Sequence, residues 1–183
     1  MTELGDLRAT RRDVGEVVET LVASFDDDPV MRWLFPASET RPTATRALFG
    51  GLVGALLDAT PSAGMVDVLP DGSAVALWED WPAGGPTPSP HTPAAAGRLA
   101  TLETALRSRH PVTERHLYLT FVGVRPALRS RGLGSTLLRH RLAYADRLGL
   151  ASYLEASSPR TLGLYERLGF APVGGTIDLP DGP

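Results

Sequence analysis

Apolar residues recur at intervals of three and four along several stretches of the chain, which is the period of an amphipathic helix. The first such stretch has its apolar positions at Val14, Val17, Val18, Leu21 and Val22. The same period predicts three more helices: a short one beginning at Pro29, a mostly apolar one over residues 44–60, and one over 94–110 that Pro111 ends.

Short apolar runs bounded by glycine, proline or aspartate predict the strands. Residues 64–70 and 73–81 flank Asp71-Gly72, which is a hairpin signal. The other expected strands are 7–10, 115–124, 152–157 and 170–179, with helices over 132–150 and 159–169 between the last three. This order predicts a mixed α/β fold ending in a β-α-β-α-β run. The proline-rich residues 83–95 are expected to be a surface loop.

Composition excludes several kinds of chemistry. The 183 residues suffice for one domain with a full core, and a net charge of −3 offers no basic surface for nucleic acid. Since no apolar run approaches the roughly 20 residues of a membrane span and no signal peptide opens the chain, a cytoplasmic protein without a membrane partner is expected. Cysteine is absent and all 18 basic residues are arginine, which excludes thiolate and lysine chemistry.

The four histidines show no metal-ligand spacing, so no metal is expected. His110 follows a predicted helix and His116 begins a predicted strand. Both are interpreted as loop or strand-edge residues.

Two glycines, Gly132 and Gly134, stand at the start of a predicted helix, although glycine costs about 0.5–1 kcal/mol against alanine in a helix interior. The first amides of a helix lack internal partners and carry the positive end of the helix dipole. Without side chains at these positions a phosphate can approach the amides. Arg129 and Arg131 add positive charge and Ser135 adds a hydroxyl, so the stretch is predicted to bind phosphate.

Two phosphate-binding motifs fit this stretch poorly. The Walker loop requires a lysine, and the chain has none. The dinucleotide fingerprint requires glycine or alanine where Leu137 stands. In addition, too few residues follow Glu155, its candidate ribose-binding acid, to form the second half of a doubly wound sheet.

A third motif, Gln/Arg-x-x-Gly-x-Gly/Ala, matches residues 129–134 at every fixed position. It follows a strand ending in Val-Gly-Val-x-Pro (122–126) and precedes "YLEASSPRTLGLYERLGF" (153–170). With this context the chain resembles the GCN5-related N-acetyltransferase (GNAT) family, and over residues 117–179 it is most similar to puromycin N-acetyltransferase and its actinobacterial relatives.

The resemblance implies the GNAT fold: a mixed central β-sheet, flanked by helices and splayed after the strand that ends at Val124. One domain over 1–183 is expected, with 1–114 on the acceptor side and 115–179 binding acyl-CoA. The pantetheine arm is expected beside the main chain near Val124, and the pyrophosphate on the amides that follow. The implied cofactor-binding residues are Val122, Gly123, Val124, Arg129, Ser130, Arg131, Gly132, Leu133, Gly134 and Ser135.

The resemblance also implies two catalytic residues. Tyr165 matches the tyrosine that protonates the departing CoA thiolate; a core aromatic on an amphipathic helix is the alternative. Glu155, at the mouth of the splayed strands, is expected to accept the proton of the amine, directly or through water. Pairing with an arginine such as Arg160, or water alone as the base, are the alternatives. Backbone amides over 122–124 are expected to stabilise the oxyanion.

The expected reaction is transfer of an acetyl group from acetyl-CoA to a primary amine of a small molecule, such as an antibiotic or an amine metabolite, by direct attack in a ternary complex. A non-catalytic acyl-CoA sensor and a protein N-terminal or lysine acetyltransferase are the alternatives. Monomer and homodimer both remain open. Family members continue past the position of Pro183 into one more strand, which does not follow here. Either the sequence is cut short before that strand, which is the favoured interpretation, or the final strand is missing.

The acceptor side offers two candidate groups. Residues 26–28 are three aspartates close to Trp33 and Phe35, which would suit a cationic amine, although a solvated turn beside a core-facing helix is the favoured interpretation. Trp78 and Trp81 would line the same cavity or, more simply, pack in the core or at its rim.

Overall fold

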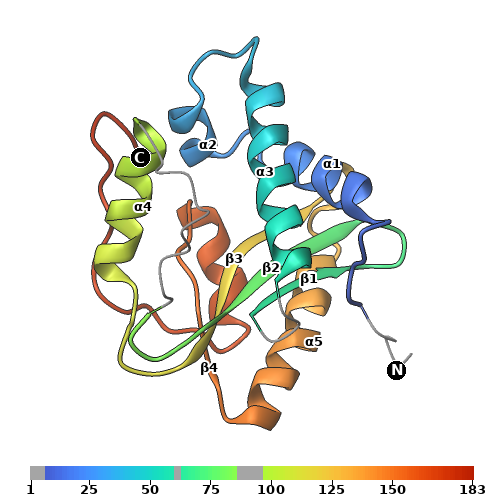
Figure 1. Ribbon diagram of the computed structural model, residues 1–183, viewed down its shortest axis with the longest axis vertical. Helices are drawn as coiled ribbons and strands as arrows, with labels where there is room; N and C mark the ends of the chain where they lie inside the picture. The colour runs from blue at the N-terminus through green and yellow to red at the C-terminus, as the bar shows by residue number, and fades with distance from the viewer. Residues whose placement is uncertain (1–6, 60–62, 86–96) are drawn as a thin grey trace.

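The computed structural model describes residues 7–59, 63–85 and 97–183 (Figure 1). Its centre is a four-stranded sheet in the order β1-β2-β3-β4. The strands are β1 (Gly64–Val68), β2 (Ala74–Trp81), β3 (His116–Val124) and β4 (Ala151–Tyr153). The first three are antiparallel and β4 runs parallel to β3, so the expected mixed sheet is confirmed.

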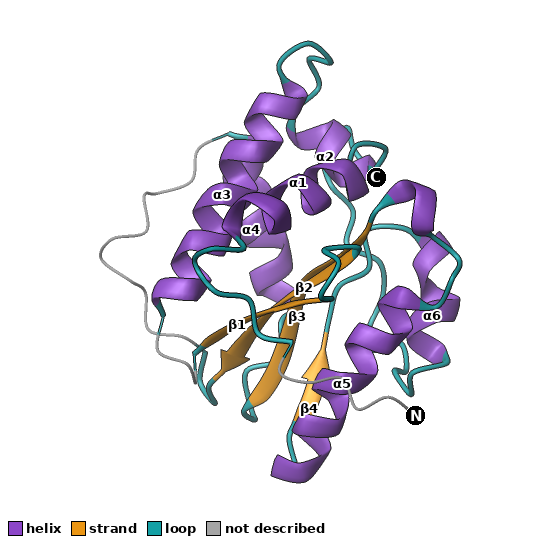
Figure 2. Cartoon of the chain, turned by 90° about the vertical axis from the view of Figure 1, so that its right-hand side faces the viewer, coloured by secondary structure: helices purple, strands orange, loops and turns teal. Residues whose placement is uncertain are grey.

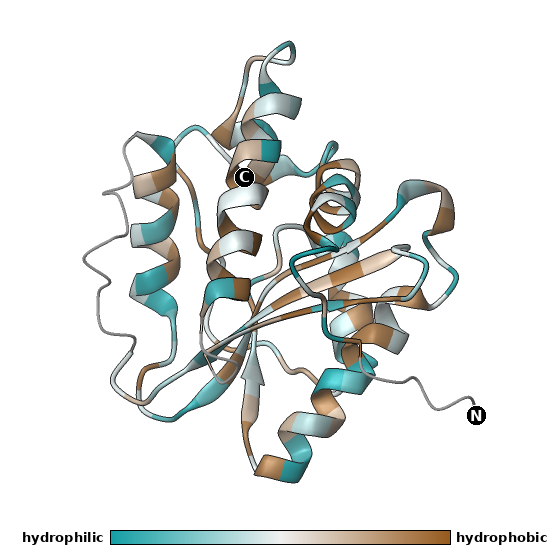
Figure 3. Cartoon of the chain, turned by 45° about the vertical axis from the view of Figure 1, so that its right-hand side comes forward, coloured by the Kyte–Doolittle hydropathy of each residue, from teal (hydrophilic) through white to brown (hydrophobic). Residues whose placement is uncertain are grey.

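Helices cover both faces of the sheet (Figure 2). The first face carries α1 (Val14–Ser24), α2 (Pro29–Leu34), α3 (Arg41–Asp58) and α4 (Arg98–Arg109). Their apolar side chains meet those of Val66, Val75 and Leu77 in one core cluster. The second face carries α5 (Leu133–Leu148) and α6 (Leu162–Glu166), which pack on Trp78 and Leu117 in a second cluster. Figure 3 shows hydrophobic positions, in brown, along the strands and along the helices that pack on them.

Local hydrogen bonds shape the turn of the β1–β2 hairpin and the start of α1. The β1–β2 hairpin turns at Gly72, whose φ of 63° is accessible to glycine, and Gly72 N–H donates to the carbonyl of Leu69 (2.8 Å). Before α1, the Asp13 carboxylate accepts from the backbone N–H of Thr10 (2.7 Å), which forms one arm of a capping box.

The sheet splays where β3 and β4 part. Only His116, Leu117 and Tyr118 of β3 pair with β4, while β3 continues to Val124 against β2. Of the strand predicted over 152–157, only the beginning forms: β4 covers three residues, Ala151–Tyr153, and the chain then leaves β3. A bulge in the β2–β3 ladder at Leu77/Trp78 leaves Thr120 without an opposite residue.

Two predicted strands are wrong in whole or in part. Residues 170–179 form no strand; instead Leu179 joins the first core cluster and the Trp33 indole N–H donates to the carbonyl of Pro180 (2.9 Å). This segment pairs with no strand in the described parts of the chain, and its end contacts Trp33 of α2 instead. Residues 7–10 form a single bridge, from Arg8 to Asp67 of β1.

The predicted helices are present with shifted ends, and the 159–169 helix begins with a 3-10 turn (Pro159–Thr161) before α6. A second 3-10 turn (Pro126–Leu128) lies between β3 and α5. Most of the predicted loop over 83–95, and the first residues of the helix predicted over 94–110, lie outside the described residues. Among the helices in the described parts of the chain, none is both long and apolar enough to cross a membrane.

Candidate active site

A cleft of roughly 2650 Å³ opens between the separated ends of β3 and β4. It is larger than the about 300–1,000 Å³ of an ordinary small-ligand pocket. Its lining includes the start of α5, residues 119–124 of β3 and the segment that follows β4. The splay therefore brings most of the predicted glycine-loop residues and the catalytic pair to one continuous cavity, and Arg131 alone of the predicted site residues is not part of its lining.

The glycine loop forms the open N-terminus of α5. Gly132 caps the helix with φ 81°, a left-handed conformation that glycine adopts without strain, and Ser130 also has a positive φ of 62°. The first helical hydrogen bond runs from Thr136 N–H to the carbonyl of Gly132 (2.9 Å). The amides of Leu133, Gly134 and Ser135 thus lie at the end of a 16-residue helix, before its first internal bond.

Gly123 allows close packing. A Cβ on Gly123 would lie 2.8 Å from Oγ of Ser24, so this glycine lets α1 pack on β3. A Cβ on Gly134 would lie 3.4 Å from Cγ2 of Val124, which is ordinary van der Waals contact, so the packing of α5 does not require glycine there. The cofactor contacts predicted for both glycines stay predictions.

The three arginines near the loop have different surroundings. Arg129 donates to the carbonyl of Ser24 (2.7 Å) and lies 3.6 Å from a carboxylate oxygen of Asp27. Arg125 likewise turns to α1, where it pairs with Glu16 (2.9 Å). Arg131 is exposed and has no ion-pair partner within the ranges that the structure describes. Of the two arginines assigned to phosphate, Arg131 is the one with an uncommitted charge.

Tyr165, on α6, is buried in the second core cluster with 9% of its surface exposed, and it contacts the Phe170 ring at 6.0 Å between centroids. Burial raises the pKa of the Tyr165 hydroxyl, and the nearby Asp28 charge raises it further. The side chain still lines the cleft. A buried hydroxyl with a raised pKa stays protonated at neutral pH, as a proton donor requires.

Glu155 follows β4 and its side chain is 14% exposed. Both carboxylate oxygens are buried, and neither has a hydrogen-bond donor in normal geometry among the described residues. Burial raises the pKa of this carboxyl; the Tyr118 and Tyr153 hydroxyls are close enough to lower it in part. The alternative of an arginine partner finds no support in the described residues, where the ionisable side chain nearest Glu155 in an ion-pair geometry is His110.

His110 and His116 are buried beside Glu155, and the expectation of loop or strand-edge positions misses this. Their Nε2 atoms lie 2.9 Å apart, and Nδ1 of His110 lies 3.6 Å from Oε1 of Glu155. The His110 ring stacks on Trp81 with 3.8 Å between centroids. The two histidines are six positions apart, on either side of Pro111, a spacing typical of no known motif, so only the tertiary structure reveals the cluster.

A second carboxylate, Glu79 on β2, faces the same cavity. Thr120, the bulge residue, donates to it (3.2 Å), and burial raises its pKa. Tyr118 lies near both Glu79 and Glu155, and burial together with their charges raises the pKa of its hydroxyl well above the usual range. No motif in the sequence indicates a role for Glu79.

Comparison with known proteins fits this geometry. Residues 63–170, more than half of the chain, match the model of the acetyltransferase (GNAT) family. The chain belongs to this family. The match includes the β1–β2 hairpin, the glycine loop and the segment with Glu155 and Tyr165.

Solved GNAT-type structures resemble the chain over nearly its whole length. The structure of "histone acetyltransferase HPA2 and related acetyltransferase" from Corynebacterium glutamicum is 33% identical, with a TM-score of 0.71 over 97% of this chain and 89% of that one. A GCN5-related N-acetyltransferase from Ralstonia eutropha is 19% identical, with a TM-score of 0.59 over 95% and 96%. An aminoglycoside N-acetyltransferase in complex with CoA is 12% identical, with a TM-score of 0.52 over 98% of each chain. The last two show the fold alone.

In the part of this GNAT chain predicted to bind the acceptor, the tryptophans divide between core and cleft. Trp33 and Trp78 are buried core residues, with 6% and 0% of their surface exposed. Trp81 lines the cleft and stacks on His110. Asp28 is committed to structure, because it caps α2 and accepts a hydrogen bond from Ser157 (2.5 Å). Asp28 is therefore not available as a free acidic group for a cationic amine.

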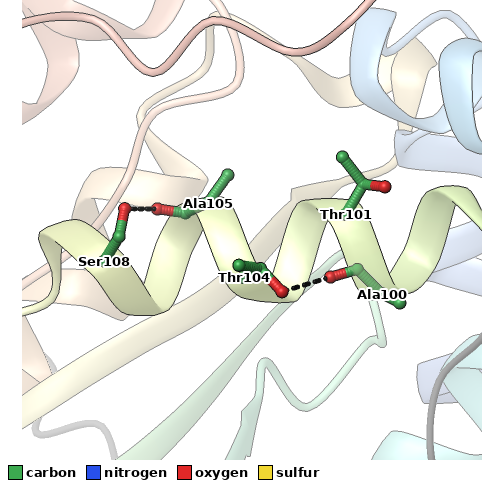
Figure 4. A pocket seen from close by; sticks show the side chains of 5 residues that line it. All are labelled: Ala100, Thr101, Thr104, Ala105 and Ser108. Carbon is green, nitrogen blue, oxygen red and sulfur yellow. Dashed lines mark hydrogen bonds between the residues drawn. The ribbon is translucent and has the colours of Figure 1, made fainter.

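A separate depression of about 470 Å³ lies on one side of α4 (Figure 4). It is lined by alanine, threonine and serine side chains. Thr104 and Ser108 donate to carbonyls of their own helix, at 2.8 and 2.7 Å. Because these hydroxyl protons are used within the helix and no titratable group lines the depression, it is not a candidate site for the GNAT chemistry.

Proposed function

We propose that this GNAT protein transfers the acetyl group of acetyl-CoA to a primary amine of a small molecule, by direct attack in a ternary complex. The observation that carries the proposal is the single cleft with an open helix N-terminus at one end and a buried, unpartnered carboxylate, Glu155, at the other. Such a cleft can hold an anionic ester and an amine next to each other.

Residues 115–179 are the acyl-CoA side of this proposal. The amides of Leu133, Gly134 and Ser135 suit the pyrophosphate because unpaired N–H groups and the helix dipole both favour an anion. Arg131 supplies the nearby uncommitted positive charge. Residues 119–124 offer a strand edge that β4 leaves open, which suits the amide groups of a pantetheine arm. Acetyl-CoA supplies an activated thioester carbonyl to this site.

Two side chains are assigned proton transfers. Glu155 accepts a proton from the ammonium form of the acceptor, so that the nitrogen lone pair is free to attack. Main-chain amides near 122–124 stabilise the oxyanion that develops on the carbonyl. Tyr165 then donates its proton to the departing thiolate, whose unperturbed pKa is near 8.5. General acid–base steps of this kind typically contribute about 10²–10⁴-fold each.

The acceptor is proposed to be a cationic amine because of the lining near Glu155. Glu79 and Glu155 bring two carboxylates to one wall, and burial raises the pKa of both. A cation beside either carboxylate would favour its charged form. A protein N-terminus or lysine, and an acyl-CoA sensor without chemistry, are the rival functions.

The test is CoA release from purified protein, acetyl-CoA and a panel of amines, followed with a thiol reagent. The panel includes small polyamines, aminoglycosides, amino-acid amides and lysine-containing peptides, with acetate esters of neutral alcohols as negative controls. Release with small amines supports the proposal, and release with peptides alone supports the protein-acetylating rival. Binding of acetyl-CoA without release in any arm would establish the sensor instead.

A further inference from the structure

Hydrogen bonding fixes the tautomers of the two buried histidines. Nδ1 of His116 lies 2.9 Å from the backbone carbonyl of Glu114, and a carbonyl only accepts, so Nδ1 of a neutral His116 carries the proton. Nε2 of that ring is then an acceptor. Since it lies 2.9 Å from Nε2 of His110, the His110 proton is on Nε2. The Nδ1 lone pair of His110 therefore faces Oε1 of Glu155, 3.6 Å away.

Two acceptors that face each other in a buried site leave room for one proton. The charged carboxylate and the lone pair of His110 repel, whereas a protonated Glu155 donates to His110 Nδ1 once the two atoms close to about 2.8 Å. A hydrogen bond made only by the protonated form of an acid raises its proton affinity. His110 thus favours proton uptake by the carboxyl that the proposed reaction needs as its base.

We infer that His110 is a positioning residue for Glu155: the chain from the Glu114 carbonyl through His116 holds His110 in the tautomer that receives the carboxyl proton. In the reaction, the N–H bond of the ammonium breaks, its electron pair stays on nitrogen, and the proton forms an O–H bond on Glu155 that is directed at His110 Nδ1. The inference rests on the proposed function for its catalytic consequence, but the tautomers themselves do not depend on it.

Each element packed around His110 and Glu155 contributes a charged or titratable side chain near one of these two residues. Arg107 of α4 and His116 of β3 face His110, and both disfavour a charge on it, as does burial. Tyr118 of β3 and Tyr153 of β4 face Glu155, and Glu79 of β2 lies on the far side of Tyr118. The Trp81 ring covers the His110 ring. The cationic form of His110 is thus disfavoured, and the shared proton belongs on the carboxyl.

The first test is NMR of the protein alone, labelled with ¹⁵N at histidine. We expect His110 to carry its proton on Nε2 and His116 to carry its proton on Nδ1 between pH 6 and 8. A His110 proton on Nδ1 in the wild type would overturn the inference. Because no acceptor or cofactor is present, this result does not depend on whether any amine is acetylated.

The second test removes the hydrogen bond from His110 to His116 that fixes the His110 tautomer. In His116→Phe, His110 is free to carry its proton on Nδ1 and to donate to the carboxylate, which favours the charged form of Glu155. We expect the ¹³C titration midpoint of the Glu155 carboxyl to fall by roughly half a pH unit or more. The acid limb of kcat/KM for the amine should move in the same direction, with a roughly tenfold lower plateau and unchanged acetyl-CoA affinity.

Two further variants separate this role from packing. His116→Gln offers an amide oxygen to His110 Nε2–H, so its titration midpoint should lie closer to that of the wild type than the midpoint of His116→Phe. His140→Phe, on α5, is the matched histidine control and should leave both profiles unchanged. An unchanged carboxyl midpoint in a folded His116→Phe protein would refute the inference. Absence of CoA release from the wild type with every amine would refute the proposed function only.

Discussion

Ser157 donates a hydrogen bond of 2.5 Å to the carboxylate of Asp28, which joins the segment after β4 to the N-terminus of α2. The other carboxylate oxygen of Asp28 accepts from the backbone N–H groups of Val30 and Met31, at 2.9 and 3.0 Å. The Asp28 side chain therefore caps α2 and links the two sides of the cleft. Its carboxylate also lies near Tyr165.

Asp28→Ala should destabilise the fold more than Ser157→Ala, because it removes both the cap and the link. The cap alone is worth about 0.5–2 kcal/mol. Asp28→Asn keeps an accepting oxygen for the cap and should lie between the two variants. Urea unfolding of the three proteins measures the order, and equal losses for Asp28→Ala and Ser157→Ala would contradict the double role.

Gly132→Ala should weaken acetyl-CoA binding by roughly tenfold or more. An L-residue with φ near 81° costs about 1–2 kcal/mol, and relief of that strain would move the first amides of α5. Gly134→Trp should abolish binding, since its side chain would enter the space at the end of β3. Gly50→Ala on α3, where an added Cβ meets nothing within 4 Å, is the matched control. Calorimetric titration with acetyl-CoA measures all three.

Tyr165→Phe should lower kcat by tenfold or more and leave acetyl-CoA affinity nearly unchanged, because the ring keeps its packing on Phe170 and loses only the donor. Steady-state CoA release and calorimetry give the two quantities. A variant with wild-type kcat would remove Tyr165 from the mechanism and leave it as a core aromatic.

The pH profile of kcat/KM for the amine should show an acid limb with a midpoint above 4.5. Burial raises the pKa of Glu155 above its ordinary value, so the carboxyl remains protonated, and unable to accept, to a higher pH. Glu155→Gln should remove that limb and most of the activity. The same acid limb in Glu155→Gln as in the wild type would mean that the base is elsewhere.

His110 should also make the folding free energy sensitive to acid. Burial lowers its pKa from 6.5 to about 4 in the folded protein. Between these values the unfolded chain binds a proton that the folded chain does not, so stability falls as pH drops from about 6.5 to 4. The free energy of unfolding of His110→Phe should fall less steeply over this window in urea titrations. Parallel curves would show that His110 is not held neutral.

Much of the fold was predictable because its signals are local. The Asp71-Gly72 turn, the long β3 and the glycine start of α5 each depend on residues adjacent in the sequence. The failures are long-range. Residues 170–179 have the pattern of a strand, but they pair with no strand in the described parts of the chain. The cluster of His110 with Glu155 joins residues far apart in sequence, and no periodicity encodes it.

The candidate site was predictable in position and less so in detail. The motif over 129–134 located the helix start, and the family resemblance located Tyr165 and Glu155 at the same cleft. It did not indicate that Arg129 would bond to the Ser24 carbonyl, that Gly123 would accommodate α1, or that Glu79 would face the cavity. The first two depend on α1 and the third on the pairing of β2 with β3, and the motif gives no information about either.

The hydrogen bond from Trp33 to the Pro180 carbonyl joins residues 147 positions apart. Closing so large a loop costs entropy that later contacts must repay, so docking of this segment should be among the last events of folding. In the folded chain the indole is buried, with 6% of the Trp33 surface exposed. Trp33 fluorescence should therefore report a slow final phase of refolding. This phase should follow the formation of the β1–β2 hairpin and of α5, which do not depend on docking of the segment.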